Sequence, residues 1–195
     1  MSVYWHIQMH LPDGVDGPTI DSHDMLEKTG SIGTGEWDDK QCRDFKSIRN
    51  GSIVLLRKGC QAIALCKIVG DNYTNDTLTQ AYLHKNFRKV EVLGWSKDYY
   101  QPSNTRLFSQ GTFSSCGSHT DQYKYIDSWL KHIDSMSFIS KTTSLLRGKR
   151  NIILQGAPGT GKTYNTAAIA LSILGVNDVN LTDHGAVMKK YDSLQ

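Results

Sequence analysis

Apolar and polar residues alternate along the first stretch of the chain. The apolar positions are Val3, Trp5, Ile7, Met9 and Leu11, and the residues between them are Tyr4, His6, Gln8 and His10. A period of two is typical of a strand that has one face against a core. The pattern therefore predicts a half-buried strand, which ends at the turn residues Pro12-Asp-Gly14.

Further short apolar runs follow, separated by turn residues. Runs at 53–57 and 61–69 are joined by Lys58-Gly59, which predicts a β-hairpin, and a run at 87–93 predicts another strand. Short helices are expected at 21–28 and 44–49, with a Gly-rich loop over 29–37 and a polar loop over 71–76. Several short strands with turns between them indicate a small β-barrel with helices rather than an open sheet.

The pattern changes after about residue 95. Residues 103–120 are rich in Ser, Thr, Gly and Asn, which predicts a loop. Ile126, Trp129, Leu130 and Ile133 then fall on one face of an amphipathic helix, and 138–146 predicts a second short helix. We therefore expect an α+β protein with a β-barrel domain at 1–120, a helical linker at 121–148 and an α/β segment at 149–195.

Composition adds few constraints. The 195 residues are 38% hydrophobic and 21% charged, with a net charge of +3. This mildly basic balance permits a nucleic-acid partner without requiring one. The chain has no run of about 18 apolar residues and no signal-like start, and its four cysteines form no CxxC pair. We expect a cytoplasmic protein with free thiols and no membrane partner.

The clearest motif lies near the C-terminal end. Gly156-Ala-Pro-Gly-Thr-Gly-Lys-Thr163 matches the phosphate-loop pattern GxxxxGK followed by Ser or Thr in full. The apolar run 151–155 before it predicts a buried parallel strand, and 164–174 after it predicts a helix that ends at Gly175. The motif thus has the strand and the helix that its mechanism needs on either side.

Each residue type in this motif has a physical role. Gly156, Gly159 and Gly161 allow tight turns, so that backbone N–H groups approach phosphate oxygens. The following helix directs its positive end at the same phosphates. Lys162 is expected to reach the β- and γ-phosphates, and the Thr163 hydroxyl to bind Mg²⁺. The expected cofactors are therefore ATP or GTP together with Mg²⁺.

Hydrolysis requires more than this loop. An NTPase of this class needs a second acidic motif after a later strand. Only about 30 residues follow Thr163, and Asp178, Asp183 and Asp192 among them do not end an apolar strand. At most one further strand fits, around 176–181. We therefore expect a domain that is cut short, with weak nucleotide binding and little or no hydrolysis.

The stretch from about 145 to 174, which contains Asn151-Ile-Ile-Leu-Gln-Gly-Ala-Pro-Gly-Thr-Gly-Lys-Thr-Tyr164, resembles the opening of AAA+ NTPases of the McrB type. These are motor subunits of modification-dependent restriction systems. The resemblance implies assembly into a homo-oligomeric ring and a separate nuclease subunit. The candidate nucleotide-binding residues are Gly156, Ala157, Pro158, Gly159, Thr160, Gly161, Lys162, Thr163 and Tyr164.

The N-terminal part has a second resemblance. The segments Trp37-Asp-Asp39, 45–59, 62–70 and 88–92 are similar to EVE or PUA-like domains, the small barrels related to YTH readers. Such domains bind modified bases flipped out of a DNA or RNA strand, between aromatic side chains. This chain has Gly51-Ser52 where the EVE pattern often has an acidic residue after the glycine. The resemblance implies DNA, possibly modified, as a partner.

Aromatic and basic residues of this part are the candidate base and phosphate contacts. A base stacked on an aromatic ring gains about 1–3 kcal/mol. The candidate cage residues are Trp37, Trp95, Tyr99 and Tyr100, and the candidate phosphate contacts are Arg57, Lys58, Lys85, Arg88 and Lys89. Tryptophans of a small barrel also serve as core, which is the role we expect for Trp5 and Trp129.

Three functions are compatible with these observations. The first is the recognition and nucleotide-binding part of a restriction NTPase. The second is a PUA-like module that binds RNA or DNA without motor activity. The third is an AAA+ remodeller whose N-terminal domain binds protein. A preference for modified over plain oligonucleotides would exclude the third.

Overall fold

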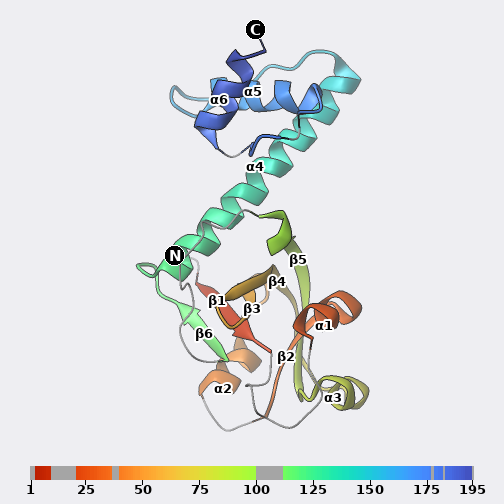
Figure 1. Cartoon of the computed structure of the whole chain (residues 1–195). Coiled ribbons are helices and arrows are strands. Elements are labelled where there is room, and N and C mark those ends of the chain that lie inside the picture. Colours follow the sequence, from red (N-terminus) through yellow and green to blue (C-terminus); the bar gives the residue numbers. More distant parts are fainter. Residues whose placement is uncertain are drawn as a thin grey trace. The chain divides into compact units, whose positions relative to one another are not determined.

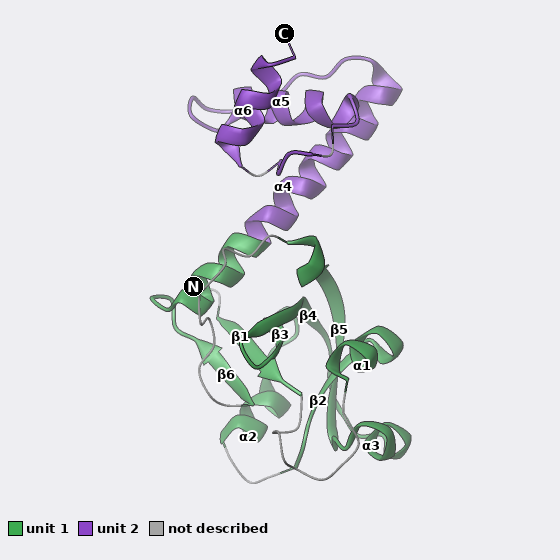
Figure 2. Ribbon diagram, in the orientation of Figure 1, with its two compact units in different colours: residues 1–129 green, residues 130–195 purple. Residues whose placement is uncertain are grey.

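A computed structural model describes residues 3–9, 21–36, 40–99, 112–176, 178–181 and 183–194. The chain divides into two compact units, residues 1–129 and 130–195, which Figure 2 colours separately. The division falls inside a long helix, α4 (Asp121–Lys149). In the described part of the chain, no helix is both long enough and apolar enough to cross a membrane.

Unit 1 is built on one mixed six-stranded sheet (Figure 1). Its strands are β1 (Tyr4–Gln8), β2 (Ser31–Thr34), β3 (Ile53–Lys58), β4 (Gln61–Tyr73), β5 (Asn86–Trp95) and β6 (Phe113–Cys116). They lie in the order β2-β5-β4-β3-β1-β6, in which only β1 and β3 run parallel. β2 and β6 are the two edges of this order, so the sheet does not close into a complete barrel. It is a curled half-barrel, which corrects the prediction of a closed β-barrel.

The hairpin between β3 and β4 confirms the prediction from the Lys58-Gly59 turn. β4 is longer than expected and continues to Tyr73, so the predicted polar loop over 71–76 is partly strand. The predicted Gly-rich loop over 29–37 contains β2, and the predicted loop over 103–120 contains β6. Both strands have only four residues, which is too short for a period of two to be evident in the sequence.

The helices that precede α4 are short, and α1 has a side-chain cap at its N-terminus. α1 (Ser22–Thr29) confirms the helix predicted at 21–28: the Asp21 carboxylate accepts from the backbone N–H groups of His23 and Asp24, at 2.9 and 3.2 Å. α2 (Lys40–Ser47) begins and ends earlier than predicted. α3 (Asp76–Tyr82) and the short 3₁₀ helix η1 (Ser96–Asp98) were not expected.

β1 is buried on both faces rather than on one. The apolar face expected from the sequence is present in Ile7, which is fully buried, and in Trp5, which stacks on Phe113 at 4.9 Å. Tyr4 and His6 on the other face are also buried, at 7% and 2% exposure. On that face Tyr4 donates a hydrogen bond to Asp127 in the first turns of α4, and His6 Nδ1 accepts one from Arg57, each at 3.1 Å.

The core of unit 1 lies between the sheet and its helices. Its fully buried large side chains include Ile7, Met25, Leu26, Ile32, Phe45, Leu56, Phe87 and Phe113. Trp5 packs against this cluster and Trp129 is 1% exposed, which confirms the core role expected for both. The side chains that remain exposed around this core are the ones that could contact a partner.

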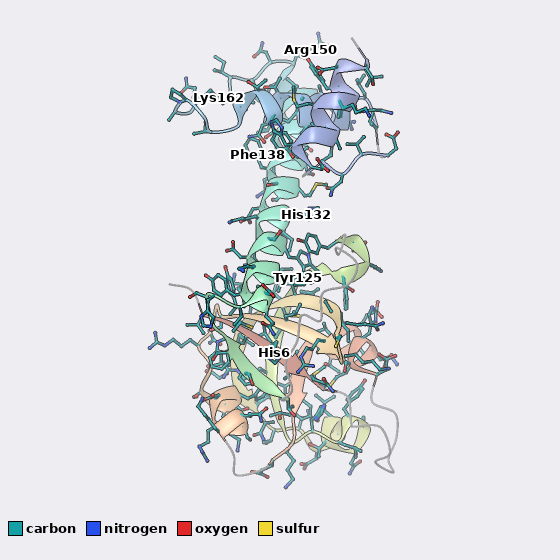
Figure 3. The ribbon with its side chains drawn as sticks, turned by 60° about the vertical axis from the view of Figure 1, so that its left-hand side comes forward. His6, Tyr125, His132, Phe138, Arg150 and Lys162 are labelled. Atoms are coloured by element: carbon teal, nitrogen blue, oxygen red, sulfur yellow. The ribbon has the colours of Figure 1, made fainter. Side chains whose placement is uncertain are left out.

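Two buried histidines make the stability of unit 1 depend on pH. Burial lowers the pKa of His6 (Figure 3) and of His84 to about 4, and the nearby Arg57 charge adds to the effect at His6. In the unfolded chain a histidine pKa is about 6.5, so the unfolded state binds more protons than the folded state between these values. The free energy of unfolding should therefore be unaffected by these groups above about pH 7 and fall as the pH is lowered towards 4.

We expect a loss of about 1–3 kcal/mol per histidine across this window. Urea unfolding at pH 7 and near pH 4 measures this loss of unfolding free energy. His84→Gln should make the unfolding free energy depend less on pH. Equal unfolding free energies at both pH values would contradict the burial of neutral imidazoles.

Unit 2 consists of helices around a small core. α5 (Lys162–Ile173) and α6 (His184–Asp192) pack together with the later turns of α4. The core is formed by Ile139, Ala167, Ala168, Ile169, Leu171 and Val187. α5 confirms the helix predicted at 164–174, and Gly175 follows it with a φ of +72°. α6 was not expected.

The structure differs from three of the expectations for this region. Residues 121–149 form one helix of 29 residues rather than two, because the sequence has no Pro and no Gly before Gly148 to end it. The segment 151–155 is not a buried strand: Ile153 is 84% exposed. A parallel strand needs a neighbour to accept and donate its ladder hydrogen bonds, and all six described strands belong to the sheet of unit 1. Nor do the described residues of 176–181 form a strand.

Candidate functional site

The phosphate loop of unit 2 is an exposed turn that leads directly into α5. Gly159 and Gly161 have φ angles of +79° and +73°, a region that residues with a Cβ rarely adopt. The Thr160 hydroxyl donates to the carbonyl of Ala157 at 2.8 Å, which closes the turn. α5 begins at Lys162 and has no acidic residue in its first turn. The positive end of α5 therefore adjoins this turn, and the first turn of the helix holds no carboxylate that would compete with an anion.

The ammonium group of Lys162 lies over this loop. Its Nζ donates to the carbonyl oxygens of Gly156 and Ala157, at 2.8 and 2.7 Å. A cation held at this position is within reach of an anion that contacts the same turn. Thr163 is exposed beside it, so its hydroxyl is accessible to a metal ion. An ammonium group and an accessible hydroxyl thus lie together at the start of α5.

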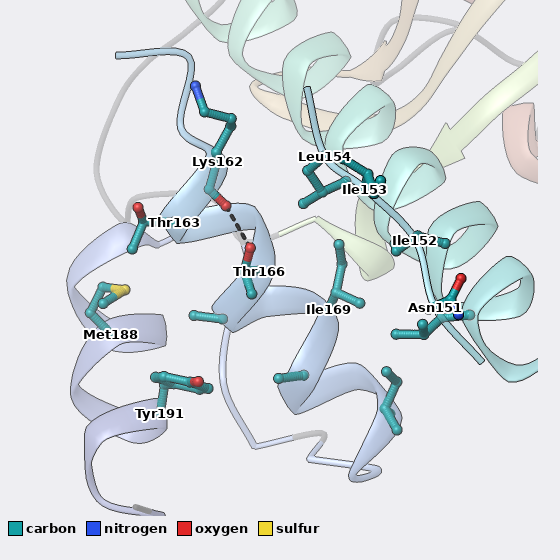
Figure 4. A pocket seen from close by; sticks show the side chains of 14 residues that line it. Asn151, Ile152, Ile153, Leu154, Lys162, Thr163, Thr166, Ile169, Met188 and Tyr191 are labelled. Atoms are coloured by element: carbon teal, nitrogen blue, oxygen red, sulfur yellow. Dashed lines mark hydrogen bonds between the residues drawn. The ribbon is translucent and has the colours of Figure 1, made fainter. Parts of the chain in front are cut away.

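Two hollows adjoin the loop. A groove of about 740 Å³ has Lys162 and Thr163 at one end and is lined further on by aliphatic residues of 151–154 and α5 and by Met188 and Tyr191 of α6 (Figure 4). A second cavity of about 480 Å³ reaches Gly156, Thr160 and Lys162. Both volumes lie in the range of small-molecule sites.

Tyr164 is engaged within unit 2. Its hydroxyl donates to the carbonyl of Leu181, and its ring stacks on His184 at 5.0 Å. Burial raises the pKa of the Tyr164 phenol above its usual value. The side chain thus links the start of α5 to the start of α6, and a contact with nucleotide would come from the part of the ring that stays exposed.

Two of the acidic residues after the loop contact other parts of unit 2. Asp183 caps α6 by accepting from the N–H of Ala186 at 3.0 Å. Asp178 pairs with Lys190 at 2.8 Å, and this lysine holds the pKa of the Asp178 carboxyl below its usual range. Neither follows a strand in the part of unit 2 that the structure describes.

In unit 1, Trp95 borders a pocket of about 230 Å³ that three distant segments form. The beginning of α1 contributes Asp21 and His23, the β3–β4 hairpin contributes Lys58 and Gln61, and η1 contributes Lys97. The His23 ring lies against the Trp95 ring at 4.4 Å. The pocket therefore combines an aromatic pair with two lysines and with side chains that can hydrogen-bond; we call it the Trp95 pocket.

Of the other candidate cage residues the structure describes Tyr99, which does not line this pocket. Tyr99 stacks on Trp129 at 5.0 Å and contacts Tyr125 edge to face, and its hydroxyl bonds to Ser128 at 3.0 Å. The Tyr99 ring therefore packs on the first turns of α4, and its predicted place behind the cage walls is not observed at the Trp95 pocket. Trp37 and Tyr100 lie outside the described residues.

Two of the candidate phosphate contacts are buried, which corrects their prediction. Arg57 and Arg88 are each 3% exposed. Arg57 donates to His6 Nδ1 at 3.1 Å, to the Gly59 carbonyl at 2.9 Å and to Gln8. Burial lowers the pKa of both guanidinium groups. Both guanidinium groups therefore form hydrogen bonds inside unit 1 and are not accessible to a phosphate at its surface.

The lysines among these candidates are exposed. Lys58 borders the Trp95 pocket, and Lys89 donates to the Thr29 carbonyl at 2.7 Å. Lys85 pairs with Glu36 at 3.0 Å. His23, Gln61 and Lys97 were missed by sequence reasoning. No local motif marks them, because only the fold brings their segments together.

No protein-family model and no curated protein matches the chain. Among solved structures it is similar to human THYN1 protein, crystallised in complex with DNA that contains 5-methylcytosine. The two are 15% identical, the alignment covers 49% of this chain and 68% of that chain, and the TM-score is 0.35. A likeness of this size leaves the function to be argued from this chain's own residues.

Proposed function

We propose that unit 2 binds the Mg²⁺ complex of ATP or GTP at residues 156–164. The observation that carries this proposal is the complete phosphate-loop motif, with Gly159 and Gly161 in the left-handed region and Lys162 over the turn. Backbone N–H groups and Lys162 would hold the phosphates, and the Thr163 hydroxyl would bind Mg²⁺. When bound, Mg²⁺ neutralises phosphate charge.

The proposal for this chain is binding rather than hydrolysis. Asp178 forms an ion pair with Lys190, and Asp183 caps the N-terminus of α6. In the described part of unit 2, neither residue follows a strand, which is the position of the carboxylate that orients the metal ion or the water in such NTPases. Equilibrium titration with Mg-ATP and Mg-GTP tests the site. Saturable binding supports it, and a chain that binds neither nucleotide contradicts it.

For unit 1 we propose an EVE or PUA-like module that binds DNA and reads a modified base in the Trp95 pocket. The supporting observation is the juxtaposition of the His23–Trp95 ring pair with Lys58 and Lys97. Aromatic rings stack on any base, and lysines can neutralise phosphates beside it. Because the His23 ring lies against the Trp95 ring, the base would contact both side chains and not the Trp95 indole alone.

Replacing Trp95 by alanine should weaken binding of a duplex that carries the preferred modification by about tenfold, since one stacked base is worth about 1–3 kcal/mol. Fluorescently labelled duplexes with 5-methylcytosine, N6-methyladenine or no modification, at one fixed salt concentration, measure this. Trp95→Phe should retain most of the affinity, and His119→Ala, an exposed ring outside the pocket, should retain all of it. Equal binding of all three duplexes, falling steeply with salt, would mean phosphate contacts alone and contradict base reading.

Together these proposals describe the recognition and nucleotide-binding part of a modification-dependent restriction NTPase of the McrB type. A separate subunit would then supply the nuclease, and the AAA+ module would assemble into a homo-oligomeric ring. RNA bound as well as DNA would favour a PUA-like module without motor activity. A chain that binds no nucleic acid would favour a protein-binding N-terminal domain.

A further inference from the structure

The cavity of about 480 Å³ in unit 2 joins the phosphate loop to an apolar surface. Gly156, Thr160 and Lys162 line it on the loop side. Phe138 from α4, together with Ile153 and Leu154 from the segment before the loop, lines it on the other side. One continuous hollow thus has a phosphate-binding part and a part made of an aromatic ring and aliphatic side chains.

The apolar part of this cavity is exposed to an unusual degree. Phe138 is 42% exposed and Ile153 is 84% exposed, although Ile139, the next residue of α4, is buried in the core. Large apolar side chains that stay exposed and lie together commonly mark a binding surface. Figure 3 shows Phe138 on α4 and Lys162 at the start of α5, both within unit 2.

We propose that Phe138 and Ile153 form the base-binding subsite of the nucleotide site, with the base stacked on the Phe138 ring. This inference rests on the proposed binding of nucleoside triphosphate phosphates by the loop. A base has a flat apolar face that suits an aromatic ring and an aliphatic wall, and the shared cavity leads from Lys162 to both. If the loop binds the phosphates of a nucleoside triphosphate, the base of the same molecule is the group that would occupy the adjoining apolar part of the cavity.

Stacking on a phenyl ring does not discriminate between purines, since every base has a π-face. The subsite should therefore contribute equally to the binding of ATP and GTP. It should contribute nothing to inorganic tripolyphosphate, which has the phosphates and lacks the base. This difference separates a base contact from a general effect on the loop.

Calorimetric titration of the full chain with the Mg²⁺ complexes of ATP, GTP and tripolyphosphate tests the proposal. Phe138→Ala should raise the Kd of ATP and of GTP by about tenfold and change that of tripolyphosphate by less than about twofold. Phe138→Tyr should restore the affinity, and Phe138→Leu should lose it while keeping an apolar side chain. The matched control is Leu145→Ala, on the same helix and 57% exposed, which should change nothing.

Three outcomes would overturn the subsite. One is unchanged ATP and GTP affinity in Phe138→Ala, and another is an equal loss for tripolyphosphate, which would indicate a role in shaping the loop. The third is a loss in Tyr191→Ala without one in Phe138→Ala, which would place the base in the groove of Figure 4. In each of these the phosphate site stands. A wild-type chain that binds none of the three ligands would overturn both proposals.

Discussion

Replacing Lys162 by alanine is expected to raise the Kd of Mg-ATP and Mg-GTP by roughly a hundredfold. Hydrogen bonds to a charged group contribute about 1.5–3 kcal/mol, and each 1.4 kcal/mol is about tenfold in Kd. Lys162 is the cation that the structure holds over the loop, with its Nζ 2.8 Å from the Gly156 carbonyl oxygen. Its removal leaves the phosphates with neutral N–H donors, so tripolyphosphate should lose affinity to the same extent.

Lys189→Ala is the matched control for this experiment. Lys189 is an exposed lysine of α6 in the same unit, and its removal changes the net charge equally. Lys162→Arg should bind nearly as weakly as Lys162→Ala, because a planar guanidinium does not replace a compact ammonium in a tight turn. A Lys162→Ala chain that binds nucleotide like the wild type would show that affinity arises elsewhere, and the nucleotide-binding proposal would then be untenable.

How much could be predicted from the sequence depends on how local each feature is. The helix after the phosphate loop was predictable because residues 164–174 are apolar and helix-forming, and α5 covers most of them. The hairpin of β3 and β4 was predictable for a similar reason, since its turn and both apolar runs are contiguous. Such features are determined by neighbours along the chain.

Features that depend on distant segments were not predictable. The Trp95 pocket takes residues from α1, from the β3–β4 hairpin and from η1, and no pattern in any one of them indicates the other two. β1 has the alternation of a half-exposed strand, yet Tyr4 is buried because the first turns of α4 cover it. The strand expected at 151–155 fails for the opposite reason, since the described part of unit 2 provides no partner strand.

The two arginines illustrate the same limit for charge. From the sequence, Arg57 and Arg88 were predicted to lie on the surface, because a charged residue is seldom fully buried unless it is paired. In the structure Arg57 donates to His6, Gln8 and the Gly59 carbonyl, and Arg88 donates to three backbone carbonyls and the Asn50 side chain. Neutral acceptors of this kind leave no mark in the charge pattern.

Arg88 should therefore matter for stability more than for DNA binding. Its guanidinium donates to the carbonyls of Gly70 at 2.8 Å, Lys46 at 3.0 Å and Ile48 at 2.7 Å, and to Asn50 Oδ1 at 3.1 Å. These acceptors come from β4, from α2 and from the chain that leads to β3, so one side chain ties three segments to β5. Removing it leaves buried acceptors unsatisfied, at a cost of about 1–3 kcal/mol for each such group, though these costs are not additive.

Arg88→Met is accordingly expected to lower the free energy of unfolding of unit 1 by about 3–5 kcal/mol, a large share of the 5–15 kcal/mol of an ordinary domain. All four tryptophans lie within residues 1–129, so tryptophan fluorescence during urea unfolding reports on this unit alone. The neighbouring Lys89→Met is the control: Lys89 is exposed, its ammonium group donates to the Thr29 carbonyl and lies 6.0 Å from the centroid of the Tyr73 ring, and its loss should cost less than about 1 kcal/mol. If the two variants unfold alike while Arg88→Met alone binds DNA less tightly, the guanidinium contacts phosphate rather than the fold, and its assignment as a buried structural group is wrong.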